Sequence, residues 1–187
     1  MATTVNRLTY DDLVELQDRP EYEHVRLEII DGELFVSAAP VTFHQRVITN
    51  ILYALEVVVR PRRLGIIFTA PVAVRLSMET TIEPDILYIG RDRRQIISTK
   101  VVEGAPDLVM EILSPDTRKR DLTVKKALYE RSGVGEYWII DPTKREVAIF
   151  SLIDGAYTAI PVNDAIARSI VIPEFAITLA DLFDLPD

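Results

Sequence analysis

The sequence contains no cysteine. This absence excludes disulfide bonds, a thiolate nucleophile and zinc sites built from thiolates. Long apolar runs are also absent: no stretch approaches the roughly 18 residues of a membrane span, and Met1 to Arg7 lacks the apolar core of a secretory signal. We therefore expect a protein of the reducing cytoplasm with no membrane partner.

Positive charge is scarce. The chain has 21 Lys and Arg against 29 Asp and Glu, a net charge of -8. Because non-specific affinity for nucleic acid comes mainly from neutralising phosphates with Lys and Arg, this balance argues against a protein that coats nucleic acid. The basic residues form three clusters, Arg60 to Arg63, Arg91 to Arg94 and Arg118 to Lys126. Each cluster fits either a local basic cleft or solvated loop charges.

The remaining composition is typical of one globular domain. The 187 residues, 48% hydrophobic and 27% charged, can bury a sizeable core, and no repeat, low-complexity stretch or linker divides them. We expect a single domain over residues 1–187.

Apolar periodicity and turn residues predict strands that alternate with helices. Helices are predicted at Thr9 to Leu16, His44 to Val59, Asp121 to Arg131 and Thr178 to Phe183. Strands are predicted at His24 to Ile30, Glu33 to Ala38, Ile66 to Thr69, Val72 to Leu76, Asp85 to Ile89, Leu108 to Leu113, Glu136 to Ile140, Val147 to Ile153 and Tyr157 to Val162. Hairpin turns are expected at Asp31-Gly32 and Asp154-Gly155. The pattern predicts an α/β (α+β) fold in which a mixed β-sheet is flanked by helices, with N-terminal and C-terminal hairpins.

Two acidic residues lie in apolar segments. Asp85 opens the run from 85 to 89, and Glu111 lies within the run from 108 to 113. Burying an ionised carboxylate is costly unless a partner compensates its charge. If strand pairing brings the two together, their repulsion must be relieved by a shared proton or a cation, and a divalent ion with oxygen ligands is the usual solution. The pair therefore predicts a metal site.

A lysine on the helix that follows these strands can join the same site. The helix has an apolar face made of Val124, Ala127 and Leu128. At about 100° per residue, Lys125 lies beside this face and reaches back toward the sheet, whereas Lys126 points to water. Tyr129, one turn further on, shares the flank of Lys125. The alternative is a boundary lysine whose stem covers the core and whose ammonium pairs with Asp121.

Several runs of the sequence resemble a known family. They are Leu27 to Leu34, Glu83-Pro84-Asp85, Gly104 to Pro115, Lys125 to Tyr129 and Gly133 to Asp141. In this order they resemble the Uma-two family, a bacterial branch of the restriction-endonuclease-like PD-(D/E)XK superfamily. The likeness extends from about Leu8 to Val162 and implies a restriction-endonuclease-like core.

The resemblance implies an endonuclease that hydrolyses DNA phosphodiester bonds with metal-activated water. It assigns the catalytic set Glu28, Asp85, Glu111 and Lys125, with Mg²⁺, or Mn²⁺ as a substitute, held by Asp85 and Glu111. The sequence departs from the superfamily at Leu113, which stands where a Glu-x-Lys motif has its lysine, and the resemblance offers Lys125 as a migrated replacement. By analogy with nucleases that cut both strands, we expect a homodimer.

Structural roles compete with these assignments. Asp85 fits a strand-start residue satisfied by turn amides, and Glu28 fits a cross-strand partner of Arg26 or Arg46. His44 begins a helix and fits a cap, a solvent contact, a catalytic base or a metal ligand.

Asp107 also follows a proline and competes with Asp85 for the acidic role. Four residues separate it from Glu111, which corresponds to about 13 Å along one strand, so we interpret it as a strand-start residue. Tyr137 and Trp138 lie in an apolar strand and are interpreted as core or subunit interface rather than as base-stacking surfaces.

Three classes of function remain. The first is the Mg²⁺-dependent endonuclease. The second is a catalytically inactive nuclease-fold module for nucleic-acid binding or protein interaction, which the acidic charge and the displaced lysine favour. The third is a metal-free enzyme with a carboxylate pair, such as a glycosidase. Metal dependence separates the first class from the third.

Overall fold

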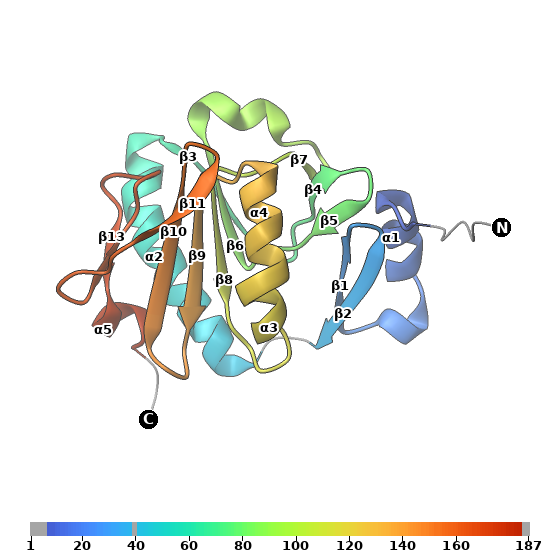
Figure 1. Ribbon diagram of the computed structural model, residues 1–187, viewed down its shortest axis with the longest axis horizontal. Helices are drawn as coiled ribbons and strands as arrows, with labels where there is room; N and C mark the ends of the chain where they lie inside the picture. Colours follow the sequence, from blue (N-terminus) through green and yellow to red (C-terminus); the bar gives the residue numbers. More distant parts are fainter. Residues whose placement is uncertain (1–6, 39–40, 185–187) are drawn as a thin grey trace.

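A mixed sheet of six strands forms the centre of the molecule (Figure 1). The computed structural model describes residues 7–38 and 41–184. Across the sheet the order is β11 (Ala156–Ile160), β10 (Glu146–Ile153), β9 (Glu136–Asp141), β8 (Leu108–Ile112), β6 (Ile86–Gly90) and β3 (Gly65–Thr69). Strands β8 and β9 run parallel, and the other neighbours run antiparallel. The predicted mixed sheet is therefore confirmed.

Helices cover both faces of this sheet, because side chains alternate across each strand. On one face α2 (Thr42–Arg62) packs against Met110 and Ile112. On the other face, Val109 packs in the cluster of α4 (Lys126–Ser132), which continues α3 (Arg118–Arg120) and η3 (Asp121–Lys125, one π-helical turn). Figure 1 shows α2 behind the sheet and α4 in front of it. The prediction of a sheet flanked by helices is also confirmed.

A second sheet of five strands lies beside the first. Its order is β2 (Glu33–Ala38), β1 (Val25–Ile30), β5 (Thr80–Ile82), β4 (Val74–Ser77) and β7 (Val102–Glu103). The predicted turn joins β1 to β2, and Asp31 and Gly32 have φ values of 52° and 80°, the left-handed pair that suits a tight hairpin. Helix α1 (Tyr10–Gln17) packs on β1 through Leu13, Leu27 and Ile29. The N-terminal hairpin thus belongs to a separate sheet.

The remaining elements are short: η1 (Pro20–Tyr22), η2 (Arg91–Ile96), β12 (Ile166–Arg168), β13 (Ala176–Thr178) and α5 (Leu179–Leu182). The second predicted hairpin turn, at Asp154 and Gly155, joins β10 to β11. The sequence did not predict β5, β7, β12 or β13, because two or three residues carry no periodicity. Residues 1–6, which contribute to the expectation of no secretory signal, lie outside the described residues. No helix in the described part of the chain is long and apolar enough to cross a membrane.

Candidate active site

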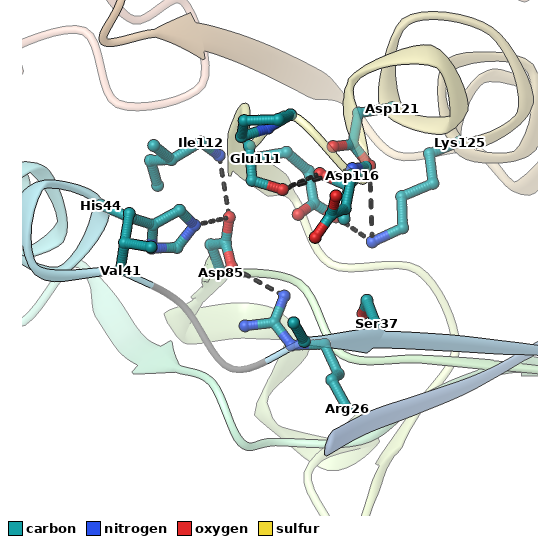
Figure 2. Close-up of a pocket in the computed structure, with 14 residues that line it drawn as sticks. Arg26, Ser37, Val41, His44, Asp85, Glu111, Ile112, Asp116, Asp121 and Lys125 are labelled. Atoms are coloured by element: carbon teal, nitrogen blue, oxygen red, sulfur yellow. Dashed lines mark hydrogen bonds and ion pairs between the residues drawn. The ribbon is translucent and has the colours of Figure 1, made fainter. Parts of the chain in front are cut away.

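The two acids predicted as metal ligands lie across one strand pair. Strands β6 and β8 pair with Ile86 opposite Met110, so Asp85, which precedes β6, lies opposite Glu111. Residues opposite each other in antiparallel strands project from the same face of the sheet. Both side chains are buried and, together with Lys125, line a pocket of about 180 Å³ (Figure 2). The structure thus brings the predicted pair and the predicted lysine together.

Asp85 accepts hydrogen bonds from three donors. Its Oδ1 accepts from Nη1 of Arg26 at 2.8 Å. Its Oδ2 accepts from Nε2 of His44 at 3.0 Å and from the backbone N–H of Ile112 at 2.8 Å. Burial alone would raise the pKa of Asp85, but the bonds from His44 and Arg26 outweigh it and lower the pKa to about 2. Asp85 is therefore ionised, and His44 donates through a protonated Nε2.

Glu111 has fewer donors and a higher proton affinity. Nζ of Lys125 at 2.9 Å and the hydroxyl of Tyr129 at 2.6 Å both donate to its Oε1. Burial raises the pKa of Glu111 to about 8, with a contribution from the charge of Asp85 and against the opposing effect of Lys125. Glu111 therefore binds a proton much more readily than an ordinary glutamate does. Its Oε2 receives neither of these bonds and is the oxygen that can carry the proton.

Lys125 lies between two carboxylates. Its Nζ is 2.8 Å from Oε1 of Glu28 and 2.9 Å from Oε1 of Glu111, but 3.9 Å from Asp121. Burial alone would lower the pKa of Lys125, but Glu111 and Glu28 outweigh it and raise the pKa. The ammonium therefore stays charged although the residue is only 1% exposed. A boundary lysine paired mainly with Asp121 does not describe this side chain.

Glu28 supplies the negative charge that Lys125 needs, and it comes from β1 of the second sheet. Its Oε2 is 3.3 Å from Nη2 of Arg120, and its Oε1 also accepts from the N–H of Glu83 at 3.0 Å. Burial alone would raise the pKa of Glu28, but Lys125 and Arg120 outweigh it and lower the pKa. Glu28 is thus an ionised carboxylate with two cationic partners.

Three structural roles considered from the sequence are wrong. Asp85 is satisfied by two side chains and a neighbouring strand rather than by turn amides. Glu28 is not a cross-strand partner of Arg26 or Arg46, because Arg26 bonds to Asp85 and Arg46 pairs elsewhere. His44 is buried against Asp85, so it is neither a helix cap nor a solvent contact.

The helix that carries Lys125 also differs from its prediction. The expected apolar face included Val124 and Ala127, but both are exposed. The buried face instead carries Asp121, Lys125 and Tyr129. This face packs against buried carboxylates, so it carries charged side chains. The positions of apolar residues therefore do not reveal it. Lys125 ends the π-helical turn η3, and such turns occur frequently at functional sites.

Three other singled-out residues have the structural roles that the sequence favoured. Asp107 precedes β8, accepts from the N–H of Gly90 at 2.7 Å and pairs with Arg93 at 2.8 Å. Tyr137 and Trp138 are fully buried in the core, so neither forms a base-stacking surface.

One of the three basic clusters contributes to the candidate site. Arg120 turns toward Glu28, whereas Arg118 pairs with Asp141 at 2.7 Å. The clusters 60–63 and 91–94 flank the far end of β3 and β6, where Gly65 pairs with Gly90. They are separated from the pocket by the length of this strand pair.

The acids of the pocket fit a hard divalent cation. Asp85 and Glu111 offer carboxylate oxygens of the kind that Mg²⁺ prefers. Burial, together with the nearby acids, raises the pKa of Glu111, and a bound cation would favour its ionised form. In the described part of the chain, no group of three or more His, Asp and Glu is arranged for a metal ion. Two carboxylates with water in the remaining positions suit Mg²⁺, which usually keeps several waters.

Arg26 and Arg120 also belong to the site and were not predicted as parts of it. Arg26 precedes Glu28 by two residues, so strand alternation places both on one face, and this signal was available. Arg120 precedes Lys125 by five residues, which a π turn but not an α-helix brings into line. The contact of His44 with Asp85 depends on how α2 docks, and no local pattern records that.

Comparisons with known proteins agree with this architecture. Residues 10–180 match the model of the family Uma2, described as "Putative restriction endonuclease". A search of curated proteins gives no match. A solved structure from Anabaena variabilis ATCC 29413, described as "a putative nuclease belonging to DUF820", superimposes with a TM-score of 0.76. The two chains are 22% identical over 95% of this chain and 98% of that one, a likeness that establishes the fold.

Proposed function

Since the chain belongs to the Uma2 restriction endonuclease family, we propose that it is a Mg²⁺-dependent endonuclease that hydrolyses phosphodiester bonds of DNA. We expect it to act in the cytoplasm as a homodimer, by analogy with nucleases that cut both strands. The catalytic set in this proposal is Glu28, Asp85, Glu111 and Lys125, with the metal ion held by Asp85 and Glu111.

The observation that carries the proposal is the pair of carboxylates that face each other across β6 and β8. Asp85 has a pKa lowered to about 2, so it is an ionised ligand at every relevant pH. Glu111 has a pKa raised to about 8 and would release its proton to accept a divalent cation. The ammonium of Lys125 lies 2.9 Å from Glu111, and this distance supports the proposal that Lys125 supplies a positive charge next to the metal ligands.

When bound, Mg²⁺ would polarise the phosphate and lower the pKa of a coordinated water. The residues of the chain hold and orient the ligands. The N–H of Ile112 and Nε2 of His44 fix Asp85, and the hydroxyl of Tyr129 fixes Oε1 of Glu111. Glu28 holds the ammonium of Lys125 at 2.8 Å, close enough to the pocket to stabilise charge on a phosphate oxygen.

A second candidate is the inactive nuclease-fold module. Lys125 is 1% exposed and already bonded to two carboxylates, and Asp85 is already bonded to Arg26. Such a closed network of charges can be purely structural. The metal-free carboxylate-pair enzyme is the third class, and it would keep its activity when divalent cations are removed.

The first experiment is calorimetric titration of Mn²⁺ into the wild type, Asp85→Asn and Glu111→Gln. We expect binding in the wild type and its loss in both variants, because each removes one of two ionic ligands. Asp107→Asn is the matched control, since Asp107 is an acid of the same sheet outside the pocket and should leave binding intact. A screen of duplex and single-stranded DNA with Mg²⁺ or Mn²⁺ follows.

The result that opposes the active nuclease is equally clear. If the wild type binds no Mn²⁺ even in the millimolar range, with or without duplex DNA, the inactive module replaces it. Binding without cleavage of any DNA, combined with full cellular effect in Asp85→Ala, would point to the same module.

A further inference from the structure

Both oxygens of Asp85 accept hydrogen bonds, and one of the donors is a cation. Nη1 of Arg26 lies 2.8 Å from Oδ1, while His44 and the N–H of Ile112 share Oδ2. Figure 2 shows the guanidinium reaching up to Asp85 from the strand below. A metal ion at Asp85 and Glu111 needs an oxygen of Asp85. Oδ2 already accepts two bonds, so the ion would bind at Oδ1, where it meets the guanidinium of Arg26.

The three partners differ in their freedom to leave. The N–H of Ile112 is fixed within β8, and His44 is buried at the start of α2. Arg26 comes from the other sheet on a long side chain that is 15% exposed, and it lines the pocket together with Ser37, its pairing partner on β2. A guanidinium and a divalent cation repel each other strongly at this distance in a buried site. Arg26 is therefore the partner that a metal ion would displace.

The charged groups around the pocket also identify Arg26 as the cation that a metal ion would displace. Five buried carboxyl groups gather here, and they belong to Glu28, Glu83, Asp85, Glu111 and Asp121. Three cations face them, and they belong to Arg26, Arg120 and Lys125. Arg120 is bonded to Glu28, which has no place in the predicted metal coordination. Lys125 is bonded to Glu28 and also to Glu111, but only at Oε1, so Oε2 of Glu111 stays available to a metal ion. Arg26 is the cation bonded to the oxygen of Asp85 that the metal would use.

We propose that Arg26 is a resident counter-cation of Asp85, that a divalent metal ion displaces it, and that the released guanidinium then binds a phosphate of the nucleic-acid substrate from the pocket wall. This inference rests on the proposed metal-dependent nuclease. The fork of N–H donors on Arg26 matches phosphate oxygens, so the same side chain can bind a carboxylate before the metal binds and a phosphate afterwards. The exchange keeps positive charge beside Asp85 at both stages.

The direct test is calorimetric titration of Mn²⁺ into Arg26→Gln and the wild type at about 0.15 M salt, where long-range charge effects are screened. We expect the variant to bind Mn²⁺ at least about tenfold more tightly, because a charged hydrogen bond no longer competes for Asp85. Arg75→Gln is the matched control. Arg75 makes two bonds to Glu103 on the exposed part of the second sheet, so its loss should leave the affinity unchanged.

Thermal unfolding separates displacement from a merely structural role. Without metal, Arg26→Gln should lower Tm, because Asp85 loses its cation. With saturating Mn²⁺ the difference from the wild type should shrink or vanish, because binding and unfolding are linked. Arg26→Lys, which keeps the charge without the fork, should fall between the two in Mn²⁺ affinity. A structural arginine would give the same loss of Tm in both conditions.

The phosphate contact has its own readout. At saturating Mn²⁺, Arg26→Gln should weaken the apparent affinity for duplex DNA and reduce the slope of log affinity against log salt by about one contact. An unchanged slope would overturn this part of the inference. Equal or weaker Mn²⁺ binding in Arg26→Gln, with normal binding in the wild type, would overturn the displacement and leave the nuclease intact. Absence of binding in both proteins would overturn both.

Discussion

The Asp85 side and the Glu111 side of the pocket are one strand apart, yet their carboxyl groups behave in opposite ways. Asp85 accepts bonds on both oxygens, from a guanidinium, an imidazole and a backbone N–H, and its pKa falls to about 2. Glu111 accepts on Oε1 alone, and its pKa rises to about 8. Burial raises the pKa of both groups, so the difference between them comes from the number and placement of the donors and of the neighbouring charges.

The largest effect is expected from Lys125→Met, which removes the cation on the Glu111 side. Glu28 would then keep only Arg120 as a cationic partner, and breaking a buried ion pair in this way costs about 3–5 kcal/mol. We expect that loss in the free energy of unfolding, measured by urea denaturation at neutral pH. Adding Glu28→Gln should recover part of the loss. A cost below about 1 kcal/mol would mean that Lys125 is not needed to hold the acids.

The next effect compares the two acids directly. Asp85→Asn should cost about 3 kcal/mol, because the amide cannot compensate Arg26 and presents a donor where acceptors are needed. Glu111→Gln should cost less than Asp85→Asn at neutral pH, because the raised pKa of Glu111 favours its uncharged form, which an amide resembles. Both values come from denaturation of the metal-free protein. Equal costs would contradict the opposite charge states.

The pH dependence of stability sharpens the same comparison. The pKa of Glu111, about 8 when folded against 4.5 as its ordinary value, means that the native state holds a proton that the unfolded state releases. The contribution of Glu111 to the free energy of unfolding therefore falls as pH rises from about 4.5 to about 8, by up to about 1.4 kcal/mol per pH unit. The pKa of Asp85 is about 2 when folded against 3.8, so its contribution is lost only as pH falls through that window.

Denaturation at several pH values tests this assignment. Glu83 and Asp121 also have raised pKa values, and both remain in the Glu111→Gln variant. Subtracting the free energy of unfolding of this variant from that of the wild type at each pH therefore cancels their effect. The difference should fall between pH 4.5 and 8. A flat difference would show that Glu111 is ionised throughout. Saturating Mn²⁺ should remove the slope, because a metal ligand holds no proton.

The smallest effect is expected at Lys126, next to Lys125 but outside the site. Its Nζ lies 3.8 Å from the ring centre of Phe150, a cation–π contact worth about 0.5–1 kcal/mol at an exposed position. Lys126→Gln should lower the free energy of unfolding by that amount and leave Mn²⁺ binding unchanged. A larger loss of stability, or weaker Mn²⁺ binding, would mean that Lys126 is part of the site.

The long elements and the central residues could be predicted from the sequence, and the contacts between layers could not. Apolar runs and the turn at Asp31 and Gly32 identified the strands because both signals are local. Asp85 and Glu111 stood out because an acid in an apolar run needs a partner. Strand alternation could have placed Arg26 on the face of Glu28, but its contact with Asp85, like that of His44, depends on docking, which no local pattern encodes.

The pattern of apolar residues does not predict the buried face of a helix when that face carries charged side chains. The helix from α3 to α4 presents Asp121 and Lys125 to the interior and leaves Val124 and Ala127 exposed. Lys125 reaches toward the sheet as predicted, but the face that was expected to be apolar is largely ionic. Such an inversion is expected when buried charges pair with each other, and sites of function are where it occurs most often.

The division of the site between two sheets bears on the order of events during synthesis. Arg26 and Glu28 lie on β1 and leave the ribosome well before Asp85 and Lys125, which are their eventual partners. A chain that has folded its early hairpin alone therefore carries half of a charge network. We expect the docking of the two sheets to be a late, cooperative event, so that nascent or partly folded chains contain no complete set of reactive groups.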